Sequence, residues 1–338
     1  MKKIIGFLFI VLLIIGAYSA WNIFGPTISS PEDKYFYIKT GSTYEDVKKS
    51  LHEQDIVKGN FFFDKISNQL KYKYNVKPGK YEIKDNSSLL SLLRMLKAGN
   101  QSPVKLVINK LRTKEDLASK IAKNFECDSL QVISFLTNND SLSSYKLDTN
   151  TVMTAVIPNT YLLKWNNTFK TLFTRLKSEQ EKFWTVERKQ KAASKNLSTT
   201  QVYIMASIVE EETNKAEDKL LIASVYRNRI ATGQKLEADP TVKFAMRNFG
   251  LKRILRGHLQ YQSPYNTYQN TGLPPGPICT PSTKTIDAVL DSPETNYIFF
   301  VAKPDFKGYS NFAATYPEHL KYAKAYQNAL DSLIKSKQ

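Results

Sequence analysis

The sequence predicts an α+β protein in which an N-terminal transmembrane helix precedes a small α/β module and a C-terminal mixed α+β domain. Three observations predict this class. Residues 4–24 carry no charge, residues 35–99 alternate strand-like and helical stretches, and the remainder combines long helical stretches with turn-rich loops. With 42% hydrophobic and 23% charged residues, the 338-residue chain has a globular composition and room for two or three domains.

Two lysines precede the uncharged run at residues 4–24. As a helix, this run would span about 30 Å, the thickness of the hydrocarbon core of a bilayer. The lysines favour a cytoplasmic stub at residues 1–3 and export of everything after the span. A cleaved signal peptide is the alternative, because the apolar core is short and small residues surround Ala20. Tyr18 fits such a cleavage site poorly, which favours a retained single-pass anchor.

The chain is strongly basic. Its formal net charge is +17, from 48 Lys and Arg against 31 Asp and Glu. Such an excess favours anionic partners such as nucleic acid, anionic lipid or an acidic polymer. An exported protein does not meet genomic DNA, so we expect no nucleic-acid partner.

Metal and thiol chemistry have little support in the sequence. Cys127 and Cys279 are the only cysteines, and no His or Cys stands near either one at metal-ligand spacing. Two distant positions do not define a disulfide, so their pairing stays open. The histidines are scattered at His52, His258 and His319. We therefore expect no metal and no cofactor, and we look to carboxylates for catalysis.

Residues 25–34 form a short linker to the small module at residues 35–99. The module is predicted to contain a strand at 35–39, a helix capped by Thr43, a helix at 61–70, a strand at 80–83 and a helix ended by Gly99. A module of this kind binds sugar chains or serves as a spacer. Residues 100–165 connect it to the C-terminal domain at residues 166–338.

One uninterrupted helix is predicted over residues 201–232, because good helix formers fill it and neither Pro nor Gly interrupts it. Thr199 or Thr200 could cap its start, and Gly233 ends it. Before it, a long basic helix is predicted over residues 168–195.

Three consecutive glutamates on the central helix point about 100° apart and cannot share one environment. Glu212 lies in an apolar row with Ile208, which would raise its pKa and suit a general acid near neutral pH. Glu211 is placed to pair with Lys215, four residues ahead. Glu210 has mixed polar neighbours that suit a hydrogen-bonded role. A solvated surface cluster of glutamates is the alternative.

Four stretches in this order resemble the endolytic murein transglycosylase (YceG-like) family. They are ASIVEEET at 206–213, DPTV at 239–242, YNTY at 265–268 and GLPPGP at 272–277. The resemblance covers essentially the whole chain and implies a lysin-motif-like module at residues 35–99 and a lysozyme-like catalytic domain at residues 166–338. One departure is Asn159, where the family usually carries Asp, although Asn can keep its hydrogen bonds.

The resemblance implies cleavage of the bond between N-acetylmuramic acid and N-acetylglucosamine within nascent peptidoglycan strands, without water, to leave 1,6-anhydro ends. The second Glu of the family's Glu-x-Glu-Thr stretch falls on Glu212, which would act as acid and then as base, with Glu210 as its supporting partner. The residues expected to bind substrate are Asp239, Thr241, Tyr265, Asn266, Thr267 and Tyr268. Expected partners are peptidoglycan synthases (penicillin-binding proteins) and the divisome, at the bacterial inner membrane with the catalytic domain outside.

Three other functions stay open. A peptidoglycan hydrolase (muramidase) could use the same scaffold with a second group that activates water. An inactive wall-binding or divisome scaffold would bind glycan strands without turnover. A membrane-surface adaptor would use the basic helix around residues 170–195.

Overall fold

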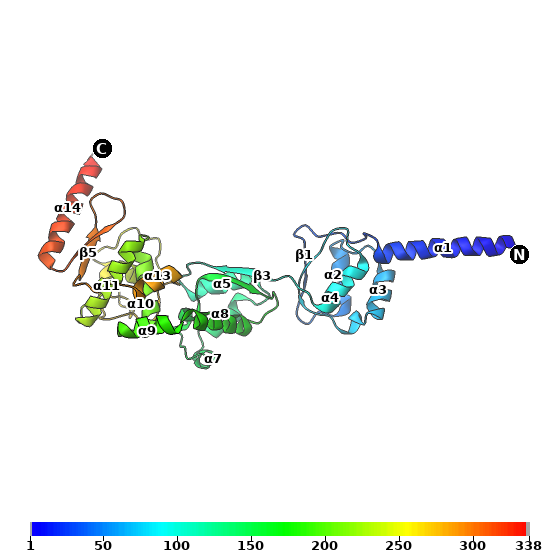
Figure 1. Ribbon diagram of the computed structural model, residues 1–338, viewed down its shortest axis with the longest axis horizontal. Coiled ribbons are helices and arrows are strands. Elements are labelled where there is room, and N and C mark those ends of the chain that lie inside the picture. Colours follow the sequence, from blue (N-terminus) through cyan, green and yellow to red (C-terminus); the bar gives the residue numbers. More distant parts are fainter. Residues whose placement is uncertain (1, 336–338) are drawn as a thin grey trace. The chain divides into compact units, whose positions relative to one another are not determined.

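The structure, a computed structural model, describes residues 2–335, which are mostly helical with three two-stranded sheets (Figure 1). Met1 of the predicted stub and residues 336–338 at the predicted end of the last domain lie outside the described residues. The predicted α+β class is confirmed. The chain divides into two compact units, the first made of residues 1–106, 121–128 and 161–168, and the second of the remainder.

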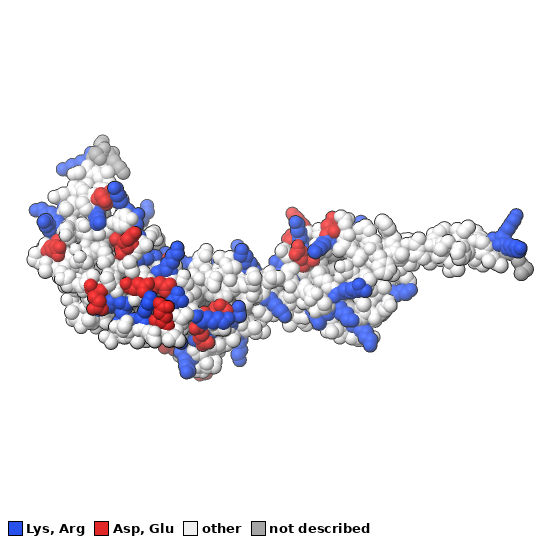
Figure 2. Space-filling model, viewed as in Figure 1, with Lys and Arg blue, Asp and Glu red and all other residues white. Residues whose placement is uncertain are grey.

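Helix α1 (Lys2–Phe24) is long and apolar enough to cross a membrane, a property that signal sequences share. None of its side chains is buried. Figure 2 shows its surface almost free of charge, with basic side chains gathered at its N-terminal end. The helix ends at Phe24, where the predicted span also ends.

The rest of the first unit follows the predicted order of short strands and helices. Its elements are β1 (Tyr35–Ile38), α2 (Tyr44–Glu53), α3 (Asn60–Gln69), β2 (Gly79–Glu82) and α4 (Leu89–Ala98). Thr43 and Asp46 form a capping box at the start of α2, and Gly99 ends α4 in the left-handed conformation. Strands β1 and β2 pair antiparallel, with Tyr35 opposite Glu82.

The division between the two units falls within three elements, namely β3 (Val104–Ile108), α5 (Lys114–Asn124) and β4 (Asn159–Leu163). Strands β3 and β4 pair with each other. The sequence did not predict β4, whose first residue is the divergent Asn159. Its five residues are too short to stand out against the turn-like Pro158 before them.

The second unit is built around a buried helix, α10. Its elements are α6 (Ser129–Leu136), α7 (Asn139–Ser143), α8 (Phe169–Phe183), α9 (Val186–Ser194), α10 (Thr199–Glu212), α11 (Ala216–Ala231), α12 (Asp239–Ala245), α13 (Thr283–Leu290), β5 (Phe299–Ala302), β6 (Ser310–Ala313) and α14 (Tyr316–Lys335). Helices α9, α11, α12 and α13 pack against α10 (Figure 1). Strands β5 and β6 pair antiparallel and contact α14.

The prediction of one helix over residues 201–232 is wrong. Helix α10 ends at Glu212 and α11 begins at Ala216, with Thr213 in an extended conformation between them. The backbone N–H of Lys215 donates to Thr213 Oγ1 at 3.1 Å, a local bond that competes with helix continuation. Ser198 caps α10 instead of either predicted threonine.

The single basic helix predicted over residues 168–195 is also wrong. Helix α8 ends at Phe183, and Thr185 caps α9. Basic side chains of α9 pair with acidic ones of α13 and its C-terminus, as Arg188 does with Asp287 at 2.8 Å. Figure 2 shows acidic and basic side chains interleaved in this region. This part of the surface is therefore largely neutralised.

Candidate active site

Glu212 is the last residue of α10, a helix that is buried along most of its length. Every residue from Val202 to Val209 is buried, which places the predicted apolar row beside this carboxyl group. The negative end of the helix dipole lies at the same terminus and disfavours a further negative charge. Glu212 itself keeps only part of its surface accessible.

A hydrogen bond from a second helix orients the carboxyl group. Tyr226 of α11 donates from Oη to Glu212 Oε1 at 2.7 Å, and the tyrosine ring is buried. In one continuous helix these residues would lie about 21 Å apart, because each residue rises ~1.5 Å. The break between α10 and α11 therefore brings the pair together.

Burial raises the pKa of Glu212 from its ordinary 4.5 to about 7. The hydrogen bond from Tyr226 and the charge of Lys243 lower this pKa in part. The negative charges of Asp239 and Glu211 raise it. A carboxyl group with such a pKa is partly protonated at neutral pH, so it can donate a proton and later accept one.

A cavity of about 390 Å³ lies beside Glu212. It brings together three residues that the sequence singled out, because Asp239 and Tyr268 also line it. Tyr268 donates from Oη to Asp239 Oδ1 at 2.8 Å. The aromatic wall was not predicted from the sequence, although Phe299 and Phe300 stand out in the apolar run at 297–302. This wall is formed by Phe299, Phe300, Tyr316 and His319.

The ring of His319 is part of this wall and stacks on Phe299 with 5.1 Å between ring centroids. Its Nδ1 atom is buried and has no hydrogen-bond partner among the described residues. Burial, followed by the nearby charge of Arg229, lowers the pKa of His319. The imidazole is therefore neutral near pH 7 and has a free polar atom beside the cavity.

A second cavity of about 330 Å³ borders Glu212 on another side and is lined by residues 210–215 with Lys110 and Gly308. A smaller cavity of about 70 Å³ adjoins Glu211 and is lined in part by Lys243. Neighbouring cavities thus share Glu211 or Glu212. Glu212 therefore lines two cavities.

The two other glutamates of the run have separate partners. Glu210 accepts hydrogen bonds from Lys219 Nζ at 2.9 Å, from Ser282 Oγ at 3.1 Å and from Thr285 Oγ1. These contacts direct its carboxylate toward α13. Any support that it gives to Glu212 is therefore electrostatic or acts through the backbone of α10.

The predicted pair between Glu211 and Lys215 is wrong. Glu211 binds Arg112 through two hydrogen bonds of 3.0 and 3.2 Å and Lys110 at 3.1 Å. Burial opposes the charge on Glu211, but these bonds outweigh it and hold its pKa below the ordinary value. Lys215 precedes α11, and its ammonium group lies 4.5 Å from the centre of the Tyr309 ring. The helix break removes the four-residue spacing on which the prediction depended.

Three predicted substrate-binding residues, Thr241, Asn266 and Thr267, are buried and bonded to neighbouring segments. Thr241 Oγ1 and Thr267 Oγ1 lie 2.8 Å apart, and Thr241 also donates to the Ala238 carbonyl at 2.6 Å. Asn266 donates to the carbonyls of Leu259 and Tyr261. The two threonines join the segments that carry Asp239 and Tyr268, and Asn266 holds the second of these segments in shape.

Tyr265 is half-buried and packs on Phe244, with 4.8 Å between ring centroids. It therefore lies in the packing beside the smaller cavity, which Phe244 lines. Asn159 is exposed, and its side chain accepts a hydrogen bond from the Thr160 backbone. In residues 2–335, no three His, Cys, Asp or Glu side chains gather closely enough to hold a metal ion.

Known proteins resemble this chain along most of its length. A curated endolytic murein transglycosylase of Bacillus subtilis (strain 168) is 27% identical over 93% of this chain and 91% of its own length. A protein of the same name from Streptococcus pneumoniae (strain D39) is 26% identical over 78% of this chain, which matches 53% of that protein.

A crystal structure of a putative yceG-like protein from Listeria monocytogenes shares the fold, with a TM-score of 0.56 and 24% identity. The match covers 86% of this chain and 99% of that one. The model of the YceG-like family matches residues 36–325. The protein therefore belongs to the YceG-like family.

Proposed function

We propose that this protein is a membrane-anchored endolytic lytic transglycosylase. It would cleave the bond between N-acetylmuramic acid and N-acetylglucosamine within nascent peptidoglycan strands and leave 1,6-anhydro ends. The observation that carries the proposal is a single carboxyl group, Glu212, with a pKa of about 7 beside a cavity with an aromatic wall. The names of the Bacillus and Streptococcus relatives support the same activity.

The reaction needs one group that gives and then takes a proton. Glu212 donates its proton to the glycosidic oxygen as the bond to C1 of N-acetylmuramic acid breaks, so the N-acetylglucosamine end leaves as an alcohol. The C6 hydroxyl of the same muramic acid attacks C1 and gives its proton to Glu212. The anhydro bond closes, no water is consumed, and the carboxyl group is again protonated.

The remaining residues have supporting roles in this proposal. Tyr226 orients the Glu212 carboxyl group. The neighbouring charges of Asp239 and Glu211 keep the pKa of Glu212 high. Glu210, two residues earlier on α10, would add electrostatic support. Tyr268 and the aromatic wall would contact the sugar rings, because stacking on flat apolar faces suits pyranose rings. Thr241, Tyr265, Asn266 and Thr267 would hold the segments that carry these groups.

Helix α1 would be a retained single span with its N-terminus inside, so that the catalytic unit acts outside the membrane. The module at residues 35–99 would bind glycan in the manner of a lysin motif. Such a tether restricts cleavage to new strands near the membrane, beside the synthases and the divisome. A role in limiting strand elongation follows from this placement.

The test is digestion of purified peptidoglycan by the chain and by Glu212→Gln, with product masses compared. The substitution keeps the shape of the side chain and removes its titrating proton, so we expect a loss of anhydro product of about 10²-fold or more. Arg247→Gln, at an exposed ion pair, is the matched control. Full activity of Glu212→Gln would refute the assignment.

A muramidase is the second candidate, because Asp239 is an exposed carboxylate on the same cavity as Glu212 and could activate water. Its products would be one water heavier than anhydro products. An Asp239→Asn variant separates the two reactions. A muramidase would lose turnover, whereas a transglycosylase would still form anhydro ends. In the variant the pKa of Glu212 should be lower, because the negative charge of Asp239, which raises that pKa, has been removed.

A further inference from the structure

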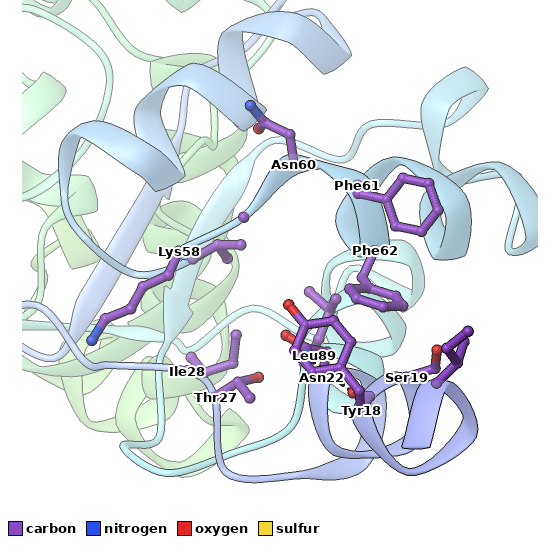
Figure 3. A pocket seen from close by; sticks show the side chains of 13 residues that line it. Tyr18, Ser19, Asn22, Thr27, Ile28, Lys58, Asn60, Phe61, Phe62 and Leu89 are labelled. Carbon is purple, nitrogen blue, oxygen red and sulfur yellow. Dashed lines mark hydrogen bonds between the residues drawn. The ribbon is translucent and has the colours of Figure 1, made fainter. Parts of the chain in front are cut away.

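A cavity of about 680 Å³ in the first unit lies between the C-terminal part of α1 and the start of α3 (Figure 3). None of the residues that line it belongs to the candidate active site. One end is apolar and includes Tyr18, Phe61, Phe62 and Leu89. Figure 3 shows Lys58 on the opposite side of the cavity from Phe61 and Phe62. The cavity is therefore amphipathic, with a cation at one end and aromatic rings at the other.

The aromatic end contacts α1 directly. Phe62 and Tyr18 meet edge to face with 5.9 Å between ring centroids, and Phe61 meets Phe62 at 5.2 Å. Phe61 is 69% exposed and is continuous with Phe62 and Tyr18 in one aromatic patch, the kind of surface that marks an interaction site. Lys65 lies 5.9 Å above its ring. Nothing in the packing of the module requires an exposed ring at this position.

The position of Tyr18 along α1 gives the depth of this contact in the membrane. With a rise of ~1.5 Å per residue, Tyr18 lies about 21 Å and Asn22 about 27 Å beyond Ile4, the first residue after the two lysines. A hydrocarbon core is about 30 Å thick, so Tyr18 lies within the outer leaflet. Phe62 and Phe61, which meet Tyr18 and each other, are then at the depth of acyl chains, and Lys58 lies across the cavity from them.

The polar end of the cavity has the features of a phosphate site. Gly59 precedes α3 and offers no side-chain acceptor to the N–H groups of the first turn. A helix N-terminus with free N–H groups attracts an anion, and the neighbouring Lys58 adds a full positive charge. Lys58, Gly59 and Asn60 all line the cavity.

We propose that this cavity holds one anionic phospholipid of the outer leaflet. Its acyl chain lies against Tyr18, Phe61 and Phe62, and its phosphate lies at Lys58 and the N-terminus of α3. The bound lipid holds the module at residues 35–99 against the bilayer surface and fixes the orientation of this module relative to α1. The inference rests on the retained span of the proposed function and goes beyond it, because nothing in glycan cleavage requires a lipid.

The experiment uses the full chain in nanodiscs made of neutral lipid with a small share of phosphatidylglycerol whose acyl chains are brominated. In a Trp21→Phe background, Phe61→Trp adds a fluorophore at the apolar end, and bromine quenches it on contact. The background protein keeps Trp165 and Trp184, so its signal is subtracted. Brominated phosphatidylglycerol should quench it with a preference of about five-fold over brominated phosphatidylcholine, the effect of one lysine near an anionic surface. Lys58→Gln should remove that preference.

Tyr74→Trp in the same background is the matched control, because Tyr74 is an exposed aromatic of the same unit that does not line the cavity. Its emission should not respond to the brominated lipid. Equal quenching at positions 61 and 74 would show that lipid contacts the surface of the unit in general and does not bind at one defined site. Recovery of emission by a polyprenyl phosphate, at concentrations where unbrominated phosphatidylglycerol has no effect, would assign the cavity to a different lipid. Either result overturns the proposal.

Two readouts separate this inference from the proposed function. The difference in emission between the unaltered chain and Trp21→Phe reports the span, because Trp21 should be quenched whatever the lipid headgroup. Quenching at Trp21 without quenching at position 61 overturns the lipid site alone, and an intact mass that lacks α1 overturns both the span and the site. Glycan cleavage in detergent by the unaltered chain and by Glu212→Gln needs no bilayer, and it tests the catalytic assignment independently.

Discussion

The acidity of one side chain links the proposed chemistry to the stability of the fold. Folded Glu212 has a pKa of about 7 against the ordinary 4.5, so the folded state holds its proton more tightly than the unfolded state. The free energy of unfolding therefore falls as the pH rises from the lower pKa to the higher one. Above the higher pKa, the whole of this loss of stability is present. Burial causes this cost, and the same burial makes Glu212 a usable acid.

The first prediction is that Glu212→Gln stabilises the protein in alkali and not in acid. The gain should be on the order of 2 kcal/mol near pH 8 and should vanish near pH 4, where the native carboxyl group is already neutral. Urea unfolding at both pH values measures it. Glu181→Gln, at an exposed glutamate of α8, is the control and should show no such difference. An equal gain at both pH values would mean that burial of charge is not the cause.

The second prediction concerns Tyr226, whose hydrogen bond lowers the pKa of Glu212. Tyr226→Phe removes the donor, so the pKa should rise by about one unit and the alkaline limit of cleavage should move up equally. Tyr203→Phe is matched, because Tyr203 is also buried in this core and donates to the Val156 carbonyl at 2.6 Å. Both variants should lose some stability, and only Tyr226→Phe should shift the pH profile. An unshifted profile would reduce Tyr226 to a structural role.

At the scale of elements, the sequence predicted best what local chemistry decides. The capping threonine of α2 and the glycine after α4 follow from caps and breakers that act within a few residues. The break after Glu212 contains neither Pro nor Gly and could not be predicted in this way. It depends on contacts from distant segments, such as Arg112 to Glu211 and Tyr226 to Glu212.

The same limit explains which site residues were predicted. Glu212 was identified because its apolar neighbours precede it on one helix. Tyr226 was missed because a continuous helix would have carried it far from Glu212. Thr241 and Thr267 were assigned to a substrate because composition does not distinguish a loop that lines a cleft from side chains that join two loops. Only burial, which the tertiary fold decides, separates these cases.

The third prediction is that the bond between Arg112 and Glu211 anchors the end of α10. Arg112→Gln should lower the free energy of unfolding by about 1–3 kcal/mol, because it leaves a half-buried carboxylate without its two-pronged partner. The folded pKa of Glu211 is depressed, so the contribution is present above its ordinary 4.5 and is lost as the pH falls through the folded pKa. A double-mutant cycle with Glu211→Gln measures the coupling.

Arg247 and Glu115 provide the control for this cycle, because both side chains of that ion pair are more than half exposed. Their coupling should be near zero, since solvent screens exposed pairs. Equal coupling in the two cycles would show that Glu211 is not a special anchor. In that case the turn at residues 213–215 would have to be stabilised by its local bonds alone.

On the scale of the whole molecule, the chain combines an apolar N-terminal helix with an excess of positive charge. The charge of +17 is spread over exposed lysines and arginines, some of which are neutralised in pairs such as those of α9. The remaining excess favours an acidic polymer over a neutral one, and the stem peptides of peptidoglycan carry carboxylates. Charge would then help the protein to find its substrate, while the cavities beside Glu212 would select the bond.

The fourth prediction tests this division of roles. The chain without α1 and with Glu212→Gln, so that it binds without cutting, should sediment with insoluble peptidoglycan several-fold less well at about 0.5 M salt than at about 0.05 M, because salt screens exposed charges. Chitin, a neutral polymer of N-acetylglucosamine, is the control and should show weak binding that salt leaves unchanged. Charge-driven encounter requires the two polymers to differ in salt dependence. Equal, salt-insensitive binding to both would mean that sugar contacts alone bring the enzyme to its strand.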